Sequence, residues 1–465
     1  MKKLKKNSIA VVLILYSYAY LAQTPNFTYN SFIISVKQNN PLAKRAENNS
    51  EYAKAQLTAA KGNFDPQLNS YIDNKQFNSG NYFTVAGAEL KQQLYTSQYI
   101  RMGYQYGQGI YLNPENTVPL VGLPYVGIEA SILRGLMFDS KRAEVIKAKH
   151  YSEFYKSEQN IQLNDLLFVA SNTYFDVLYT KKVNKLFAYF ADLANQRLKG
   201  ITELSLIGER PIVDTVEAAI FLQSRLLDLQ SGEIEMIKKF NELLILDPVS
   251  NKSFTGGYFV SDSLDKIYGL VQTSIKKIVA NDEVTNPMIT QYMAKQKVLE
   301  TEAKLKKEMI KPVLDVSYNF LNTNSNIIFP TFNTNNYKWG ATFSFPLFLR
   351  KPRHEYKMAS ITAKNNELEL FNKQNQLTYK RKLLIEALQV TSLQIANAER
   401  SSNYSKILVE AERLKFVNGE SSLFLLNSRE NKWLETELKL AEYKLKFLKG
   451  FIELVYVNGN MKYEL

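Results

Sequence analysis

The chain contains no cysteine and only two histidines among its 465 residues. The absence of cysteine excludes disulfide bonds, thiolate-bound metal sites and an acylated N-terminal cysteine, and with it a lipoprotein. The two histidines, His150 and His354, lie in basic surroundings, and we expect both to be solvated. HExxH, P-loop, Gly-x-Ser-x-Gly and post-strand GxGxxG motifs are also missing. We therefore expect no enzyme activity, no catalytic residue, no cofactor and no metal site.

Long hydrophobic runs are absent except at the N-terminus. A basic start, an apolar stretch at residues 9–21 and Ala22-Gln23 form the pattern of a secretory signal peptide, which we assign to residues 1–22. No later stretch of 18 apolar residues occurs, so we expect no transmembrane helix. Such a chain can enter a membrane only as a closed β-barrel, because lipid offers no partners to unpaired backbone groups.

Apart from the basic N-terminus and the short basic clusters before the long helices, charges of the two signs are interleaved along the sequence. The formal net charge is +13, but lysines and glutamates are interleaved, as in the segment 300–308. This is typical of a solvated helix face, and together with the expected export it argues against nucleic-acid binding. No Pro/Gly/Ser-rich linker interrupts the chain, which favours one duplicated domain over several independent ones.

An internal repeat is the most informative feature that is present. Asn40-Pro41 and Pro66 in the first half correspond to Asn286-Pro287 and Pro312 in the second, and the two prolines are 25 residues apart in both halves. Each half also has a Pro-x-Leu motif, at residues 66–68 and 312–314. The chain is therefore expected to consist of two versions of one unit.

Each copy continues in the same order. Period-2 residues lead to Phe138 or Phe348 and a basic cluster, and a helical pattern then runs 70 residues to Gly208 or 71 residues to Gly419. A second helix follows each glycine. We expect a first repeat at 23–246, with strands at about 68–134 and long helices at 139–246. An equatorial linker segment at 247–285 follows. The second repeat is expected at 286–457, with strands at about 313–345 and long helices at 352–457, and a short tail at 458–465 ends the chain.

The strand regions show alternation of apolar and polar residues. In the second copy, residues 314–320 and 338–345 alternate in this way, and the polar segment 322–336 between them suits an external loop. The first copy is longer and predicts four strands, near 68–77, 82–94, 99–111 and 125–134. It therefore has an extra hairpin, and the sequence leaves open whether that hairpin joins a barrel wall or lies outside it.

The helical regions show coiled-coil spacing. Apolar residues from Leu438 to Val455 recur in steps of three and four, and a looser pattern runs through Leu222, Ile237 and Leu244. A helix of about 70 residues is roughly 105 Å long, so the shorter returning helices and the helices that begin at Pro41 and Pro287 would have to stack end-on to match it. Within the linker, the apolar face from Leu264 to Ile278 predicts a short helix packed on the long ones.

These features together resemble the TolC-like outer membrane efflux protein family, also called outer membrane factors. The resemblance rests on the duplicated Asn-Pro, the Pro-x-Leu motifs, the two phenylalanines before the long helices and the two glycine turns. It implies a mostly helical homotrimer with a helical tunnel capped by one shared outer-membrane β-barrel of twelve strands, four from each chain. It also implies a passive duct in the outer membrane of a Gram-negative bacterium that extends into the periplasm and docks onto a periplasmic adaptor and an inner-membrane pump.

The resemblance places adaptor docking and gating at the two glycine turns. The candidate residues are Gly208, Glu209, Asp214, Gly419 and Glu420. The glycines allow positive φ and close backbone approach, and the carboxylates could form an acidic ring in a trimer. Two alternatives are that the glycines serve only as hairpin turns and that the acids are solvated residues at helix N-termini. Near residue 425, where the family has gate carboxylates, this sequence has none.

Two other functions fit parts of the pattern. A periplasmic adaptor would have a single helical hairpin within a small β-domain, and a surface coiled-coil trimer would lack amphipathic strands. The duplicated strands favour an outer-membrane channel over both.

Overall fold

The computed structural model describes residues 28–247, 260–279, 286–323, 328–459 and 461. The expected signal peptide, the middle of the expected loop at 324–327 and most of the expected tail lie outside the described residues. The chain divides into two compact units. We call Met1–Ala46, Asn160–Asn286 and Asn375–Leu465 the helical unit, and Glu47–Gln159 and Pro287–Gln374 the sheet unit. Among the described helices, none combines the length and the apolarity needed to span a membrane.

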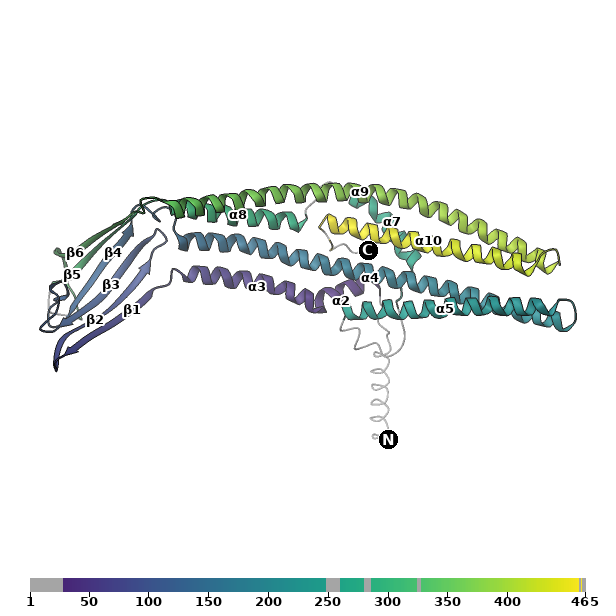
Figure 1. Ribbon diagram of the computed structural model, residues 1–465, viewed down its shortest axis with the longest axis horizontal. Helices are drawn as coiled ribbons and strands as arrows, with labels where there is room; N and C mark the ends of the chain where they lie inside the picture. Colours follow the sequence, from purple (N-terminus) through teal and green to yellow (C-terminus); the bar gives the residue numbers. More distant parts are fainter. Residues whose placement is uncertain (1–27, 248–259, 280–285, 324–327, 460, 462–465) are drawn as a thin grey trace, which may run out of the picture. The chain divides into compact units, whose positions relative to one another are not determined.

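The sheet unit contains one antiparallel sheet of six strands in chain order (Figure 1). Its strands are β1 (Gln67–Phe77), β2 (Gly80–Gln93), β3 (Gln98–Gln108), β4 (Leu123–Ser131), β5 (Val313–Asn322) and β6 (Phe332–Ser344). All four strands of the first copy are therefore part of the same sheet as the strands of the second copy, and we call the outer pair, β1 and β2, the extra hairpin. Strand β6 begins at Phe332, earlier than the sequence pattern indicated, because Phe332 and Tyr337 also pair with β5, opposite Asn322 and Phe320.

The register gives the sheet one apolar and one polar face. Residues paired across strands share a face, and one row of paired residues is apolar through all six strands. It consists of Leu68, Leu90, Met102, Val126, Phe320 and Tyr337. The adjacent row lies on the opposite face and is polar or small. It consists of Gln67, Lys91, Arg101, Gly127, Asn319 and Lys338.

Two very long helices belong to both units. They are α4 (Ser140–Leu206, 67 residues) and α9 (Arg350–Val417, 68 residues). After each glycine turn a helix of 35 residues returns, α5 (Ile212–Leu246) after α4 and α10 (Leu423–Val457) after α9. The shorter helices are α2 (Tyr29–Asn39), α3 (Pro41–Gly62), α7 (Leu264–Val279), α8 (Pro287–Glu308) and the 3-10 helix η1 (Pro114–Asn116).

The core of the helical unit follows the coiled-coil spacing closely in α10 and less closely in α5. Ala441, Leu448, Ile452 and Val455 of the α10 pattern are buried. In α5, however, Ile237 is exposed, and the buried large residues are Leu222, Phe240 and Leu243. The looser pattern of α5 therefore predicted one core position, Ile237, incorrectly.

Helix α7 packs on α10, as the apolar face of the linker segment indicated. Leu264, Ile267 and Val271 are buried, and the ring of Tyr268 meets that of Phe447 edge-on at 5.3 Å between centroids. Lys444 of α10 also forms an ion pair of 2.8 Å with Asp265 of α7. Apolar packing and a polar contact therefore both fix α7 to the returning helix.

Asp262, just before α7, joins three elements of the helical unit. It accepts hydrogen bonds from the backbone N–H of Tyr29 in α2 and from the hydroxyl of Tyr174 in α4, both at 2.9 Å. Lys266 adds an ion pair of 2.9 Å. Burial alone would raise the pKa of this carboxyl, but the hydrogen bonds from Lys266, Tyr29 and Tyr174 and the charge of Lys266 outweigh it and lower the pKa below its ordinary value.

The two phenylalanines that precede the long helices occupy different environments. Phe138 is buried with Ala143 and Leu305, whereas Phe348 is 76% exposed. The start of α4 is fixed by Asp139, whose carboxylate accepts a 2.7 Å hydrogen bond from the backbone N–H of Arg142 and is a cap of the kind that stabilises a helix N-terminus. Phe138 and Phe348 therefore occupy equivalent positions in the sequence but pack differently.

The duplicated Asn-Pro performs the same role in both copies. The Asn40 side chain donates a 2.8 Å hydrogen bond to the carbonyl of Leu246, the last residue of α5. The Asn286 side chain donates one of 2.9 Å to the carbonyl of Val457, the last residue of α10. Each asparagine thus satisfies a carbonyl that a helix C-terminus leaves unpaired, and each following proline occupies the first position of the next helix, where its missing N–H costs nothing.

Candidate functional site

The two glycine turns have the same backbone structure. Gly208 has φ of 81° and Gly419 has φ of 77°. At the first turn, the N–H groups of Gly208 and Glu209 donate to the carbonyls of Ser205 and Leu204 at 3.1 and 2.9 Å. At the second, Gly419 and Glu420 donate to Phe416 and Lys415 at 3.2 and 2.8 Å. Both are Schellman motifs, in which a residue with positive φ ends the helix.

Within the described chain, close backbone approach is not what these glycines provide. A Cβ atom built at Gly208 or Gly419 would have no heavy atom within 4 Å among the described residues. The constraint on both positions is therefore conformational, because L-residues with a branched side chain rarely adopt positive φ. The open space beside them leaves room for another molecule.

The three candidate acids have different surroundings. Glu209 and Glu420 are exposed and follow the glycines directly. Asp214 lies in the first turn of α5 and has Arg210 as an ion-pair partner at 3.9 Å. Of these three acids, Glu209 and Glu420 present a solvated carboxylate at the turns, and Asp214 also stabilises the local turn.

Arg210, which follows the first turn and lies outside both α4 and α5, brings the two turns together. Arg210 lies with its guanidinium over the Phe416 ring, 4.5 Å from the ring centroid, and it donates a 3.1 Å hydrogen bond to the Phe416 carbonyl. Below this contact is a cluster of buried apolar residues from α4, α5, α9 and α10. It comprises Ile201, Ala218, Phe416, Leu423 and Leu426. The tips of the α4/α5 and α9/α10 hairpins thus share a small core.

A buried ion pair lies next to this core. Arg197 of α4 pairs with Glu430 of α10, and it also donates a 2.7 Å hydrogen bond to the side chain of Asn427. The Glu430 side chain is 1% exposed and that of Arg197 is 10% exposed. Burial raises the pKa of the Glu430 carboxyl above its ordinary value, although the charges of Arg197 and Arg225 oppose this. Among the described residues, the second carboxylate oxygen, Oε2, has no hydrogen-bond partner.

The site predicted from the sequence did not include this pair. The sequence nevertheless contained a signal for this pair, since both residues occupy core positions of helical patterns. Arg197 lies between the buried residues Ala194 and Ile201, and Glu430 lies between Leu426 and Leu434. A charge at such a position is either paired or functional, and two such charges on different hairpins could have been matched to each other.

Exposed apolar side chains surround both turns. The residues concerned are Leu206, Ile207, Ile212, Val213, Val417 and Phe424. Next to the first turn, a groove of about 740 Å³ between α4 and α5 is lined mainly by apolar and small residues, among them Leu198, Val216, Ile220 and Leu227. Clusters of exposed apolar residues of this kind mark sites of contact with other molecules.

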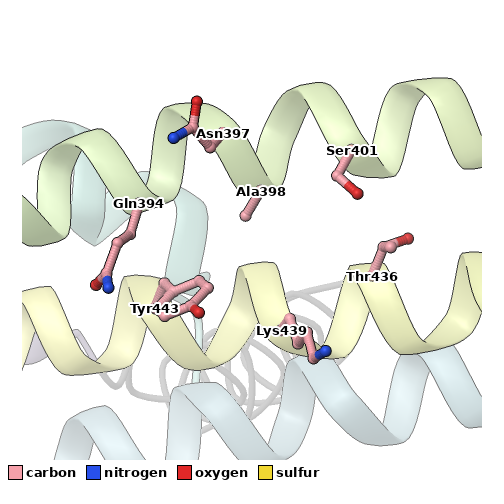
Figure 2. A pocket seen from close by; sticks show the side chains of 7 residues that line it. All are labelled: Gln394, Asn397, Ala398, Ser401, Thr436, Lys439 and Tyr443. Carbon is pink, nitrogen blue, oxygen red and sulfur yellow. The ribbon is translucent and has the colours of Figure 1, made fainter.

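A second cavity between α9 and α10 has no catalytic arrangement. Its volume is about 340 Å³, and Gln394 and Ala398 of α9 point toward α10 across it (Figure 2). Lys439, on its wall, is engaged by Glu435 at 2.8 Å. In the parts of the chain that the structure describes, no group of three His, Asp or Glu residues could hold a metal ion.

The fold was compared with those of known proteins. No family model matches the chain, and no curated protein sequence matches it. Solved structures do match. They include the Campylobacter jejuni CmeC outer membrane channel, with 14% identity, a TM-score of 0.65, and 92% of this chain and 85% of that chain covered.

The chain has the fold of outer membrane channels. The outer membrane protein VceC from Vibrio cholerae has 11% identity, a TM-score of 0.64, and coverage of 93% of this chain and 96% of its own. The MtrE outer membrane channel of Neisseria gonorrhoeae has 13% identity, a TM-score of 0.64, and coverage of 92% and 88%. The resemblance inferred from the sequence motifs is thus confirmed at the level of fold.

Proposed function

We propose that this protein is the outer-membrane channel of a tripartite efflux system or a type I secretion system in a Gram-negative bacterium, and that it extends into the periplasm. The observation that carries this proposal is the channel fold combined with a sheet that has one apolar and one polar face through six strands. The apolar face suits lipid, and the polar face suits a water-filled lumen. Neither a periplasmic adaptor nor a surface coiled coil has a use for such a sheet.

The channel is a homotrimer. Six strands are fewer than the eight of the smallest closed membrane barrels, and an open sheet edge is not viable in lipid. One chain therefore needs further copies to close a wall, and three copies are what the family resemblance implies. The long helices of the three copies form the tunnel.

The hairpin tips are the docking and gating end. Gly208, Glu209, Asp214, Gly419 and Glu420 surround two turns that carry exposed apolar side chains. We assign this surface to a periplasmic adaptor, which connects the duct to an inner-membrane pump. The protein is a passive duct and catalyses no reaction.

The proposal is tested by locating and reconstituting the full-length protein. We expect a heat-modifiable trimer that is extracted by detergent from the outer membrane fraction and that conducts ions in planar bilayers. A strain that lacks the protein should become sensitive to some members of a panel of toxic compounds, and affinity capture of the tagged protein should recover an adaptor. Recovery as a soluble periplasmic monomer after gentle lysis would overturn the proposal.

A further inference from the structure

The first copy contributes four strands where the second contributes two, and all six pair in chain order, with register shifts at Lys75/Gln76 and at Phe320/Asn322. The apolar row that runs from Leu68 to Tyr337 crosses the extra hairpin without interruption. The β1/β2 hairpin is closed by a two-residue turn in which Asn78 and Ser79 both have positive φ, at 50° and 62°. Such a turn matches the twist of the strands that it joins. The extra hairpin is therefore a regular continuation of the sheet.

Side chains on the polar face tie the extra hairpin to its neighbours. Glu89 and Lys91 of β2 are joined to Arg101 of β3 and Glu129 of β4, since Arg101 pairs with both acids and Lys91 reaches Glu129 at 3.0 Å. The two acids and two bases neutralise each other. The Tyr125 hydroxyl also donates to Glu89 at 2.5 Å. A hairpin folded back into the lumen would lose these contacts.

The same packing of tyrosine on glycine occurs inside and outside the extra hairpin. A Cβ atom at Gly87 of β2 would lie 2.6 Å from the Tyr71 ring of β1. A Cβ atom at Gly103 of β3 would lie 2.5 Å from the Tyr125 ring of β4. In both cases an aromatic ring on the polar face lies over a glycine in the adjacent strand, so β1 is packed as a wall strand.

The two edges of the sheet suit each other. Within the described chain, the outer edges of β1 and β6 pair with no other strand, and the strands have 11 and 13 residues. Ile72 of β1 and Trp339 and Phe343 of β6 are largely exposed on the apolar face. Long edges with exposed apolar residues are templates for pairing with another chain. Because every neighbouring pair is antiparallel, β1 and β6 run in opposite directions, and β6 of one copy can continue antiparallel into β1 of the next.

We infer that β1 of each copy pairs with β6 of the next, so that three copies of six strands close a wall of 18 strands rather than the twelve that the family resemblance implies. This inference rests on the proposed trimeric channel. Barrel diameter grows roughly linearly with strand number, and barrels of 16–18 strands enclose an aqueous channel. The lumen at the sheet end is then about 1.5-fold wider than that of a twelve-stranded barrel. It suits bulky solutes of either charge, because the ion network on its wall is internally neutral.

The seam between copies is tested by cysteine cross-linking of the full-length protein in native membranes. The chain has no cysteine, so the introduced thiols are the only ones in this protein. Ile72→Cys is combined in turn with Tyr337→Cys, Trp339→Cys and Ala341→Cys, which share its face, and each double variant is oxidised. Directly opposed residues in antiparallel strands have Cβ atoms about 4.5–5.5 Å apart. The matched control combines Ile72→Cys with Gly340→Cys on the opposite face.

We expect a covalent ladder that ends at the trimer for at least one of the three pairs and no ladder for the control. A trimer that conducts ions but gives no cross-link for any same-face pair would overturn the seam and leave the channel function standing. Labelling of Ile72→Cys in the trimer by a membrane-impermeant thiol reagent would also overturn it, because a wall strand places this side chain in lipid. If no trimer and no conductance are found, the proposed function fails together with this inference.

Pore width gives a second test that does not depend on strand register. Deletion of residues 67–93 removes β1 and β2 and leaves Pro66 joined to the turn before β3, so the topology is preserved with four strands per copy. Polymers of graded size are added on the side of the barrel in planar bilayers, and the largest polymer that reduces the current is recorded for each protein. We expect the deletion to lower the cross-section at the sheet end about twofold. Equal exclusion limits for the two conducting proteins would overturn the wider wall.

Discussion

Removal of one partner of the buried Arg197–Glu430 pair should loosen the hairpin tips. Arg197→Met keeps an unbranched apolar stem but removes the guanidinium, so the Glu430 side chain stays buried, 1% exposed, without its ion-pair partner. Breaking a buried pair in this way typically costs about 3–5 kcal/mol. Since each 1.4 kcal/mol is a factor of ten, separation of the α4/α5 and α9/α10 tips should become about 10²- to 4 × 10³-fold more frequent.

The double variant Arg197→Met with Glu430→Leu should behave differently. Replacement of a buried pair by apolar residues of similar volume is often neutral or stabilising. Here the pair is also incompletely satisfied, since Glu430 Oε2 has no hydrogen-bond partner in the described chain, and the apolar cluster around Leu426 is adjacent. We therefore expect the double variant to regain the tip stability of the wild type.

Amide hydrogen exchange and single-channel recording measure both consequences. Exchange protection in the first turns of α10 and the last turns of α4 should fall in Arg197→Met and recover in the double variant, and the conductance should rise and recover in parallel. The matched control is Lys432→Met, which removes an exposed pair of 2.9 Å with Glu435 on the same helix and should change neither quantity, because exposed pairs contribute about 0–1 kcal/mol. If Arg197→Met left protection and conductance at the wild-type level, the pair would not hold the tips together.

Three further predictions follow from the described geometry. The double variant Gly208→Val with Gly419→Val should leave trimer abundance normal but abolish adaptor cross-linking, since φ near 80° costs a branched residue about 1–3 kcal/mol per turn. Asparagine at both positions tolerates this conformation and should retain the cross-linking. Equal cross-linking in the valine and asparagine variants would contradict the assignment of the turns as the docking surface. Trp339→Arg, in the middle of β6 on the apolar face, should lose ~2–4 kcal/mol and fail to assemble, whereas Thr342→Arg, on the polar face, should assemble and change the conductance; similar assembly of both would show that the faces are misassigned. Asp262 has a lowered pKa in the folded state, so its stabilising effect is complete above its ordinary pKa of 3.8 and is lost as the pH falls through the lower folded value. Asp262→Asn should therefore be less stable at neutral pH by about 1.5–3 kcal/mol, and thermal unfolding followed by circular dichroism should no longer show this loss of stability in acid. If the variant loses stability in acid as the wild type does, other carboxyls cause that loss.

The strands and the long helices could be predicted because their patterns are local. Alternation over a few residues identified the strands, and the apolar face of Tyr318, Phe320 and Trp339 follows from it directly. The glycine turns were predictable for the same reason, since a helix C-terminus with positive φ requires a residue such as Gly208 or Gly419 at one position. Each of these features depends on only a few consecutive residues.

The remaining features depend on pairing between distant segments. Pairing of β2 with β3 joins β1 and β2 to the sheet, and pairing of β4 with β5 joins the two copies. Alternation within a strand does not determine which strands are neighbours. The Arg197–Glu430 pair joins residues 233 positions apart. Phe138 and Phe348 stand at equivalent sequence positions but differ in burial, since Phe138 packs with Leu305 of α8 whereas Phe348 is 76% exposed.

The Asn-Pro junctions explain why the duplication is visible in the sequence at all. The two copies diverge in strand number, in the packing of the phenylalanine junctions and in the burial pattern of α5 and α10, so most positions tolerate change. At Asn40 and Asn286, however, one side chain must donate to the last carbonyl of a returning helix, at Leu246 or Val457, while the next residue begins another helix. Few residues other than asparagine have a short side chain with an N–H donor, and proline is favoured directly after it. The motif therefore persists where two helices meet, because the backbone groups at that junction leave few chemical alternatives.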